Sequence, residues 1–214
     1  IFGKGFKQFT KPFYVSTNST IGEEKTADDV RRRVDAALER LGTEKIHFFH
    51  MWCIMNMDHF KAVIAPGGPY EGAMKLKEEG LIDHVVFSAH ANGGEIRKMC
   101  ESKLFEGVLL GYNIFNHSNR SEGIQAAREN NMGVAVMNPL GGGMVPAAAE
   151  KLDYLVERED ETVIQAALRF VISDPGVTLA LAGMGTIEHV EENAKVGDRM
   201  QQPDPATVER LKEQ

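Results

Sequence analysis

The chain has 214 residues, of which 43% are hydrophobic and 26% are charged. This composition excludes an intrinsically disordered protein and fits a folded chain with a sizeable core. The 24 basic and 31 acidic residues give a formal net charge of -7, which argues against a general nucleic-acid or anionic-membrane binder. No apolar run approaches the roughly 20 residues that a membrane helix needs. We therefore expect no nucleic-acid partner and no membrane partner.

The cellular compartment is indicated by the first residues and by the cysteines. The start IFGKGFKQFTK lacks a long apolar core followed by small residues, so it does not resemble a secretory signal. Cys53 and Cys100 have neither CxxC spacing nor a Cys/His metal pattern, and two cysteines make no disulfide framework. The sequence therefore predicts a cytoplasmic protein with reduced thiols and no metal site.

Short apolar runs alternate along the chain with longer segments of helical period. A strand is expected at 13–17, and a helix follows Thr26, which has capping-box spacing to Asp29 and precedes an apolar stripe that ends before Gly42. The next strand is expected at 46–52. Later strands are expected at 84–88, 107–112, 133–138 and 178–182, and later helices at 70–79, 94–100, 121–130, 162–172 and 187–196, with a last short helix from Pro205.

Six strands that are each followed by a helix imply a parallel sheet, because helical crossovers return the chain in the same direction. An open doubly wound sheet and a (β/α) barrel both satisfy this pattern. The G-x-G-x-x-G fingerprint of a Rossmann fold is absent, and the glycine triplet 141–143 is followed by Met144-Val145-Pro146, which is expected to break a helix. No linker, low-complexity tract or repeat divides the sequence. We therefore expect a single domain over residues 1–214.

Several motifs occur along the chain in an order that is characteristic of one protein family. They are the segments 29–42, 45–50 and 77–90, the pair Tyr112-Asn113, and the segments Gly133-Val-Ala-Val-Met-Asn-Pro-Leu-Gly-Gly-Gly and Ala182-Gly-Met-Gly-Thr-Ile-Glu-His-Val-Glu-Glu-Asn. By these motifs, nearly the whole chain resembles the aldo/keto reductase superfamily. The variants present are most similar to the branch whose longer members append an iron–sulfur cysteine segment, although this sequence has no such cluster.

The resemblance implies a (β/α)8 TIM barrel that binds NADP or NAD and reduces a small carbonyl substrate with a Tyr acid, supported by a Lys, an Asp and a His. Aligned with that pattern, the chain begins inside the second helix, so about six of the eight strand–helix units are present and the Asp and Tyr are missing. Asn18 stands at the Lys position and Trp52 at the His position. His50 lies two residues earlier, on the same strand face as Trp52.

Each of these candidates also has a structural interpretation. His50 fits a barrel-interior histidine that is hydrogen-bonded to a neighbour, or a group that handles a proton. Trp52 fits a plug at the barrel mouth, or a ring that stacks on nicotinamide or substrate. The candidate catalytic residues are therefore His50, Trp52 and Asn18.

The resemblance also implies where a nucleotide binds. It assigns Ser88 to the nicotinamide carboxamide, and it assigns two glycine-rich segments to phosphates, which glycine amides and helix N-termini hold well. His189 stands where many members carry the Arg that pairs with the 2′-phosphate of NADPH, so NADP and NAD both stay open. The candidate cofactor-binding residues are Ser88, Asn138, Pro139, Leu140, Gly141, Gly143, Gly183, Met184, Gly185, Thr186, His189, Glu192 and Asn193.

Three functions are compatible with these residues. The first is an oxidoreductase that transfers a hydride between a nicotinamide and a carbonyl or alcohol. The second is a catalytically lapsed homologue that acts as a binding or scaffold module, which is motivated by Asn18, Trp52 and Leu109, the last at the family's amide-holding Gln. The third keeps the cofactor and uses His50 as an isomerase or lyase. A six-unit barrel has two open strand edges, so we expect residues upstream of Ile1 or a partner chain, such as a second copy, to complete it.

Overall fold

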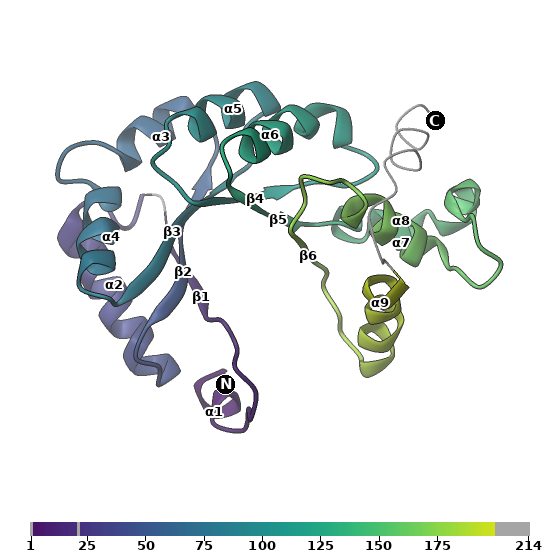
Figure 1. Cartoon of the computed structure of the whole chain (residues 1–214), viewed down its shortest axis with the longest axis horizontal. Coiled ribbons are helices and arrows are strands. Elements are labelled where there is room, and N and C mark those ends of the chain that lie inside the picture. The colour runs from purple at the N-terminus through teal and green to yellow at the C-terminus, as the bar shows by residue number, and fades with distance from the viewer. Residues whose placement is uncertain (1, 21, 200–214) are drawn as a thin grey trace. The chain divides into compact units, whose positions relative to one another are not determined.

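The computed structural model describes residues 2–20 and 22–199, in which six parallel strands alternate with helices (Figure 1). The strand order in the sheet is the order along the chain. This arrangement corresponds to part of a (β/α)8 barrel, as the sequence predicts. The helix expected from Pro205 lies outside the described residues. The strands are β1 Ser16–Thr20, β2 Ile46–Ile54, β3 Ile82–Ala89, β4 Gly107–Gly111, β5 Gly133–Met137 and β6 Leu179–Leu181.

The helices agree with the expected ones in number and order, apart from short additional pieces. The α-helices are α1 Phe2–Phe6, α2 Ala27–Leu41, α3 Met57–Val63, α4 Pro69–Glu78, α5 Gly93–Glu101, α6 His117–Glu129, α7 Met144–Ala147, α8 Val163–Ile172 and α9 Ile187–Arg199. Three single 3-10 turns are η1 Gly141–Gly143, η2 Ala149–Lys151 and η3 Asp153–Leu155.

The chain packs as two compact units. Unit 1 comprises the described residues of 1–91 and 98–108, and unit 2 comprises those of 92–97 and 109–214. That the whole chain forms a single domain stays a prediction.

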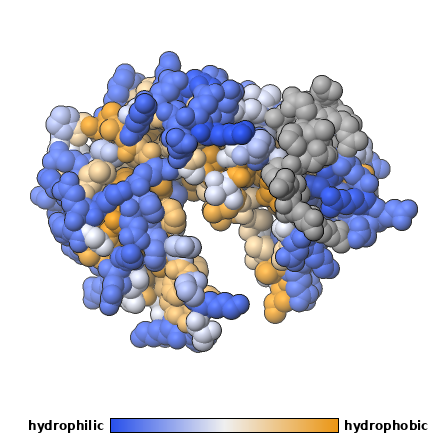
Figure 2. Space-filling model, viewed as in Figure 1, coloured by the Kyte–Doolittle hydropathy of each residue, from blue (hydrophilic) through white to orange (hydrophobic). Residues whose placement is uncertain are grey.

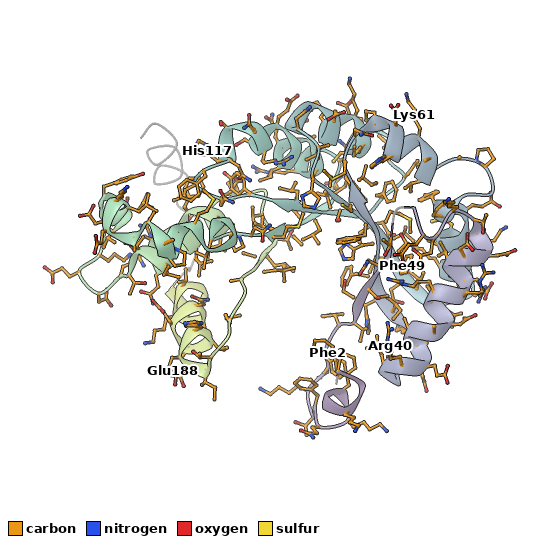
Figure 3. The ribbon with its side chains drawn as sticks, turned by 180° about the vertical axis from the view of Figure 1, so that it is seen from behind. Phe2, Arg40, Phe49, Lys61, His117 and Glu188 are labelled. Atoms are coloured by element: carbon orange, nitrogen blue, oxygen red, sulfur yellow. The ribbon has the colours of Figure 1, made fainter. Side chains whose placement is uncertain are left out.

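In unit 1, helices cover one face of β1–β3. The Thr26 hydroxyl accepts a hydrogen bond from the Asp29 amide while the Asp29 carboxylate accepts one from the Thr26 amide, so the expected capping box starts α2. Gly42 ends α2 in a left-handed conformation. Helices α2 and α4 pack on each other and on the strands (Figure 1). Phe49, Met51 and Phe87 are fully buried, and Phe49 points from β2 toward these helices (Figure 3).

The opposite face of β1–β3, which we call the open face, carries the alternate residues of the same strands. On β2 these are Phe48, His50 and Trp52, which are only partly buried or exposed. Their Cα partners on β1 are Ser16, Asn18 and Thr20. The period of two therefore places His50, Trp52 and Asn18 on one face, as predicted for His50 and Trp52.

Three of the expectations need correction. The first strand begins at Ser16 and not at Phe13, because Phe13 packs in a ring cluster 4.8 Å from Phe6. Helix α3 was not expected; Asn56 caps it by accepting hydrogen bonds from the amides of two following residues. The segment from Met144 starts α7 and does not break a helix, because Pro146 stands in the first turn, where no amide donor is needed.

In unit 2, α8 supports the strands through a mixed apolar and ionic core. Thr162 and Gln165 form a capping box at its start. The buried Tyr112 ring stacks on Phe170 at 5.7 Å, and its hydroxyl donates to Asp174 at 3.0 Å. Apolar side chains come to the surface where β6 leads into α9 (Figure 2). These exposed residues are Leu179, Leu181, Met184, Ile187 and Val190.

The N-terminal helix α1 lies against the carboxyl end of α2, where Figure 3 labels Phe2 and Arg40. A Cβ on Gly3 would meet the Arg40 carbonyl oxygen at 2.6 Å, so only glycine permits this approach. Among residues 2–20 and 22–199, no helix is long and apolar enough to cross a membrane. The same residues contain no group of three His, Cys, Asp or Glu side chains that could hold a metal ion.

Candidate functional site

His50 is the ionisable group in the middle of the open face of unit 1. Its Nδ1 is buried and has no hydrogen-bond partner among the described residues. Burial lowers the pKa of His50 from its ordinary 6.5 to about 4, because the charged imidazolium loses its hydration. At neutral pH the ring is therefore uncharged, and its role can be that of a hydrogen-bonding group rather than a cationic acid.

Asn18 is paired with His50 across β1 and β2 and supplies an amide where the family resemblance expects a Lys. Its Nδ2 donates to the Ser19 carbonyl oxygen at 3.2 Å. Arg33 of α2 reaches the same strand and donates from Nε to the Asn18 carbonyl oxygen at 3.2 Å. Glu24 lies 3.3 Å from the Arg33 guanidinium and neutralises it. Asn18 and its neighbourhood therefore bring no net positive charge to the open face.

Trp52 is at the carboxyl end of β2, where an irregularity alters the strand. Met51 is opposite Phe87 and Ile54 is opposite Ala89, so β2 has one residue more than β3 in this interval. Trp52 is 39% exposed. Ser88, on the open face of β3, is completely buried, and its Oγ accepts a hydrogen bond from the Cys53 amide at 3.0 Å.

In unit 2, the glycine-rich loop after β5 consists largely of residues with a left-handed backbone. Asn138, Gly141, Gly142 and Gly143 all have positive φ values. The Gly141 amide donates to the Asn138 carbonyl, whereas the Gly142 amide donates to no described residue. These three consecutive glycines have no Cβ, so the backbone amides of the loop are open to close approach by an anion. Leu140 and Pro139 lie within this loop.

Two side chains from the segment after β4 hold the loop in place, and the sequence did not indicate them. Asn113 Nδ2 donates to the Asn138 carbonyl oxygen at 3.0 Å. Phe115 lies under Gly141, where a Cβ would meet its ring at 3.1 Å. The sequence motif Tyr112-Asn113 includes one of these residues, but it does not reveal which carbonyl the Asn113 amide binds.

The start of α9 is the other glycine-containing segment of unit 2. Gly183, Met184, Gly185 and Thr186 are exposed. The Thr186 hydroxyl accepts a hydrogen bond from the His189 amide at 3.3 Å, as an N-cap residue does. The four residues thus form an accessible helix N-terminus, which favours anions.

The remaining candidates on α9 are placed differently from one another. His189 is exposed, and its Nδ1 accepts from the Gly185 amide at 3.4 Å. Glu192 accepts a hydrogen bond from the Thr162 hydroxyl at 2.7 Å, and its carbonyl accepts one from Gln165 at 3.1 Å. Glu192 therefore ties α9 to the start of α8. Asn193, the next residue, is half-buried.

Comparison with known proteins assigns a family to this geometry. The profile of the aldo/keto reductase family matches residues 2–213. The chain is 25% identical over 172 residues to an uncharacterized oxidoreductase of Schizosaccharomyces pombe, a match that covers 78% of this chain and 52% of that protein. It is 22% identical over 194 residues to the uncharacterized oxidoreductase YrpG of Bacillus subtilis, covering 78% of this chain and 58% of that one. The chain thus spans little more than half the length of these relatives.

Solved structures with the same fold cover almost all of this chain. One is an aldo-keto reductase of Bacillus halodurans in its holo form, with a TM-score of 0.80 at 16% identity. The match covers 99% of this chain and 76% of that protein. A thermostable aldo-keto reductase in complex with the inhibitor epalrestat has a TM-score of 0.79 at 16% identity, with 99% and 75% covered. At this identity the two structures show the fold, which is that of the partial barrel.

Proposed function

The chain belongs to the aldo/keto reductase family. We therefore propose that it is part or all of an oxidoreductase that transfers a hydride between a nicotinamide cofactor and a small carbonyl or alcohol. The observation that carries the proposal is that Asn18 of β1 is paired with His50 of β2, and that Trp52 lies two residues further along β2 on the same face. Ligands of (β/α) barrels bind at the carboxyl ends of the strands; Asn18 and His50 lie at the middle of β1 and β2, and Trp52 lies toward the carboxyl end of β2. The comparisons give no support to the catalytically lapsed homologue that Asn18, Trp52 and Leu109 motivate.

The residues of unit 2 fit the phosphates of a nicotinamide nucleotide. The glycine-rich loop offers the Gly142 amide, which has no partner among the described residues. The start of α9 offers the exposed residues Gly183 and Thr186. Both features bind negative charge without a basic side chain. NADP and NAD are both compatible, because the exposed His189 replaces the Arg that would favour a 2′-phosphate.

A bound nicotinamide supplies or accepts the hydride. The uncharged His50 then acts as a hydrogen-bonding group for the substrate oxygen, since its pKa of about 4 makes an imidazolium donor rare at neutral pH. We infer that water delivers the proton that completes the alcohol, because a neutral imidazole N–H gives up its proton poorly. Trp52 offers a flat apolar surface for the reacting carbon, and Asn18 offers a second hydrogen-bonding group beside His50.

Binding and turnover test this proposal separately. Trp52 is the only tryptophan, so its fluorescence reports ligands at the open face while calorimetry measures the affinity for NADPH and NADH. We expect at least one nucleotide to bind and a panel of aldehydes and ketones to oxidise it. His50→Gln is expected to lower kcat and leave nucleotide affinity nearly unchanged. If neither nucleotide binds to the purified protein, the proposal is wrong.

Two further parts of the proposal concern surroundings rather than chemistry. We infer a reducing, cytoplasmic location, supported by Cys53 and Cys100, which are both described and form no disulfide.

We also infer that β1 and β6, the two ends of the strand order, are covered in the working protein by chain preceding Ile1 or by a second copy. The longer solved relatives support this inference, as do the exposed Leu179 and Leu181 on β6.

A further inference from the structure

The turn at the carboxyl end of β2 contains a strained residue. Cys53 has a φ of 64°, in the left-handed region, which is strained for a residue with a Cβ. It lies in the interval where β2 carries one residue more than β3. Such bulges re-aim side chains and must be held by their surroundings.

The bulge decides which side chains reach the open face. Met51 and Ile54 are three residues apart, yet both are completely buried with their partners Phe87 and Ala89. In a regular strand, residues three apart point to opposite faces. Cys53 is the additional residue of the bulge, and Trp52 projects from the open face.

A single hydroxyl holds this arrangement from the neighbouring strand. Ser88 is 0% exposed, and its Oγ accepts the Cys53 amide hydrogen at 3.0 Å. Ile54, the residue after Cys53, accepts a hydrogen bond at its carbonyl from the His90 amide at 3.0 Å, and regular pairing resumes there. Without Ser88, the Cys53 amide has no other described acceptor in this structure, so the strained turn would lose its hydrogen bond.

We propose that Ser88 is a positioning residue for Trp52, acting through the Cys53 amide, and not the contact for a nicotinamide carboxamide that the family resemblance implies. Its complete burial suits a bond within the protein better than a bond to a ligand. The importance of Trp52 for a substrate rests on the proposed function. The positioning itself is a property of the protein without any ligand.

The fluorescence of Trp52, the only tryptophan in the chain, measures this positioning directly. In Ser88→Ala without cofactor, we expect a red-shifted Trp52 emission and stronger quenching by acrylamide. Cys53→Gly in the Ser88→Ala background is expected to restore much of both signals, because glycine adopts a positive φ without strain and needs less support from the hydrogen bond. Cys53→Gly alone should leave the emission close to that of the original protein.

Thr178→Val is the matched control. The Thr178 hydroxyl accepts a hydrogen bond from the Val134 amide at the same 3.0 Å, but in unit 2. Its loss should lower stability and leave the Trp52 emission unchanged. If folded Ser88→Ala keeps the original emission and quenching, or if Cys53→Gly restores nothing, the positioning role is overturned.

The same variants separate this proposal from the proposed function. A shifted Trp52 emission that Cys53→Gly rescues, in a protein that binds neither NADPH nor NADH, supports the positioning role while the proposed function fails. Loss of nucleotide affinity in Ser88→Ala with unchanged Trp52 emission would instead show a direct ligand contact and overturn the positioning role.

Discussion

At the scale of single residues, the burial of His50 couples folding to pH. Its pKa in the folded protein is about 4 against 6.5 ordinarily, so between these values the unfolded chain binds more protons. The stability associated with neutral His50 is thus complete above pH 6.5 and is lost as the pH falls toward 4. A shift of this size corresponds to roughly 3–4 kcal/mol.

We predict that His50→Gln removes this part of the acid sensitivity. Urea unfolding at pH 7 and at pH 4.5 should show a smaller fall in unfolding free energy for the variant than for the original protein. His189→Gln, a change at an exposed histidine, is the control and should leave the pH dependence unaltered. If the unfolding free energy falls equally for the original protein and His50→Gln, the burial of an unpartnered imidazole is contradicted.

Position 189 leads to a prediction about cofactor choice. A guanidinium can pair with a 2′-phosphate through two charge-assisted hydrogen bonds, which a neutral imidazole cannot form. We therefore expect His189→Arg to strengthen NADPH binding by roughly tenfold, about 1.4 kcal/mol, with little effect on NADH. Calorimetry with both nucleotides measures the ratio, and an equal gain for the two would show that position 189 does not face the 2′ position.

Alternation along β2 was enough to predict that His50 and Trp52 share a face. The bulge after Met51 was not predictable, because nothing in Met51-Trp52-Cys53-Ile54 marks a left-handed residue, and Cys is not a usual choice for one. The partner of the Cys53 amide, Ser88, comes from the next strand. Contacts between strands depend on register, which a single sequence indicates only through its apolar pattern.

At the scale of elements, a buried arginine ties the segment after the glycine-rich loop to α8. Arg169 donates from Nε to Glu161 at 2.8 Å, lies 3.0 Å from Glu157, and donates to the Leu155 carbonyl at 3.2 Å. The side chains of Arg169 and Glu161 are 4% and 3% exposed. Removing one member of such a pair leaves the other charge buried without compensation.

We predict that Arg169→Met lowers the unfolding free energy by about 3 kcal/mol or more. It should also make the segment 149–161 more sensitive to limited proteolysis. Arg158→Met, which removes an exposed arginine from the same segment, serves as the control and should change stability by no more than about 0.5 kcal/mol. A stability change of similar size in both variants would contradict the role of burial.

The elements themselves were mostly predictable where their ends carry local chemistry. Thr26 and Asp29 predict the start of α2, and Gly42 predicts its end, because capping depends on residues three or four positions apart. Helix α3 was missed because it has only seven residues and its cap, Asn56, stands among methionines without an apolar period. The contacts of Arg169 could not be foreseen, since its partners come from a segment without regular period.

At the scale of the whole molecule, the exposed apolar residues of an edge strand determine how the chain behaves in solution. Strand β6 is at one end of the strand order, and Leu179 and Leu181 are 46% and 52% exposed. An uncovered strand edge with apolar side chains pairs readily with other chains. We therefore predict that the 214-residue chain self-associates as its concentration rises.

A lysine on this strand should oppose that association, because charged side chains protect natural sheet edges. In sedimentation velocity at several concentrations, we expect Leu181→Lys to shift the distribution toward the monomer. Met144→Lys makes the same chemical change at an exposed apolar residue of α7, away from the strand edge, and should leave the association unchanged. If the original chain stays monomeric at every concentration, this edge does not attract a partner copy.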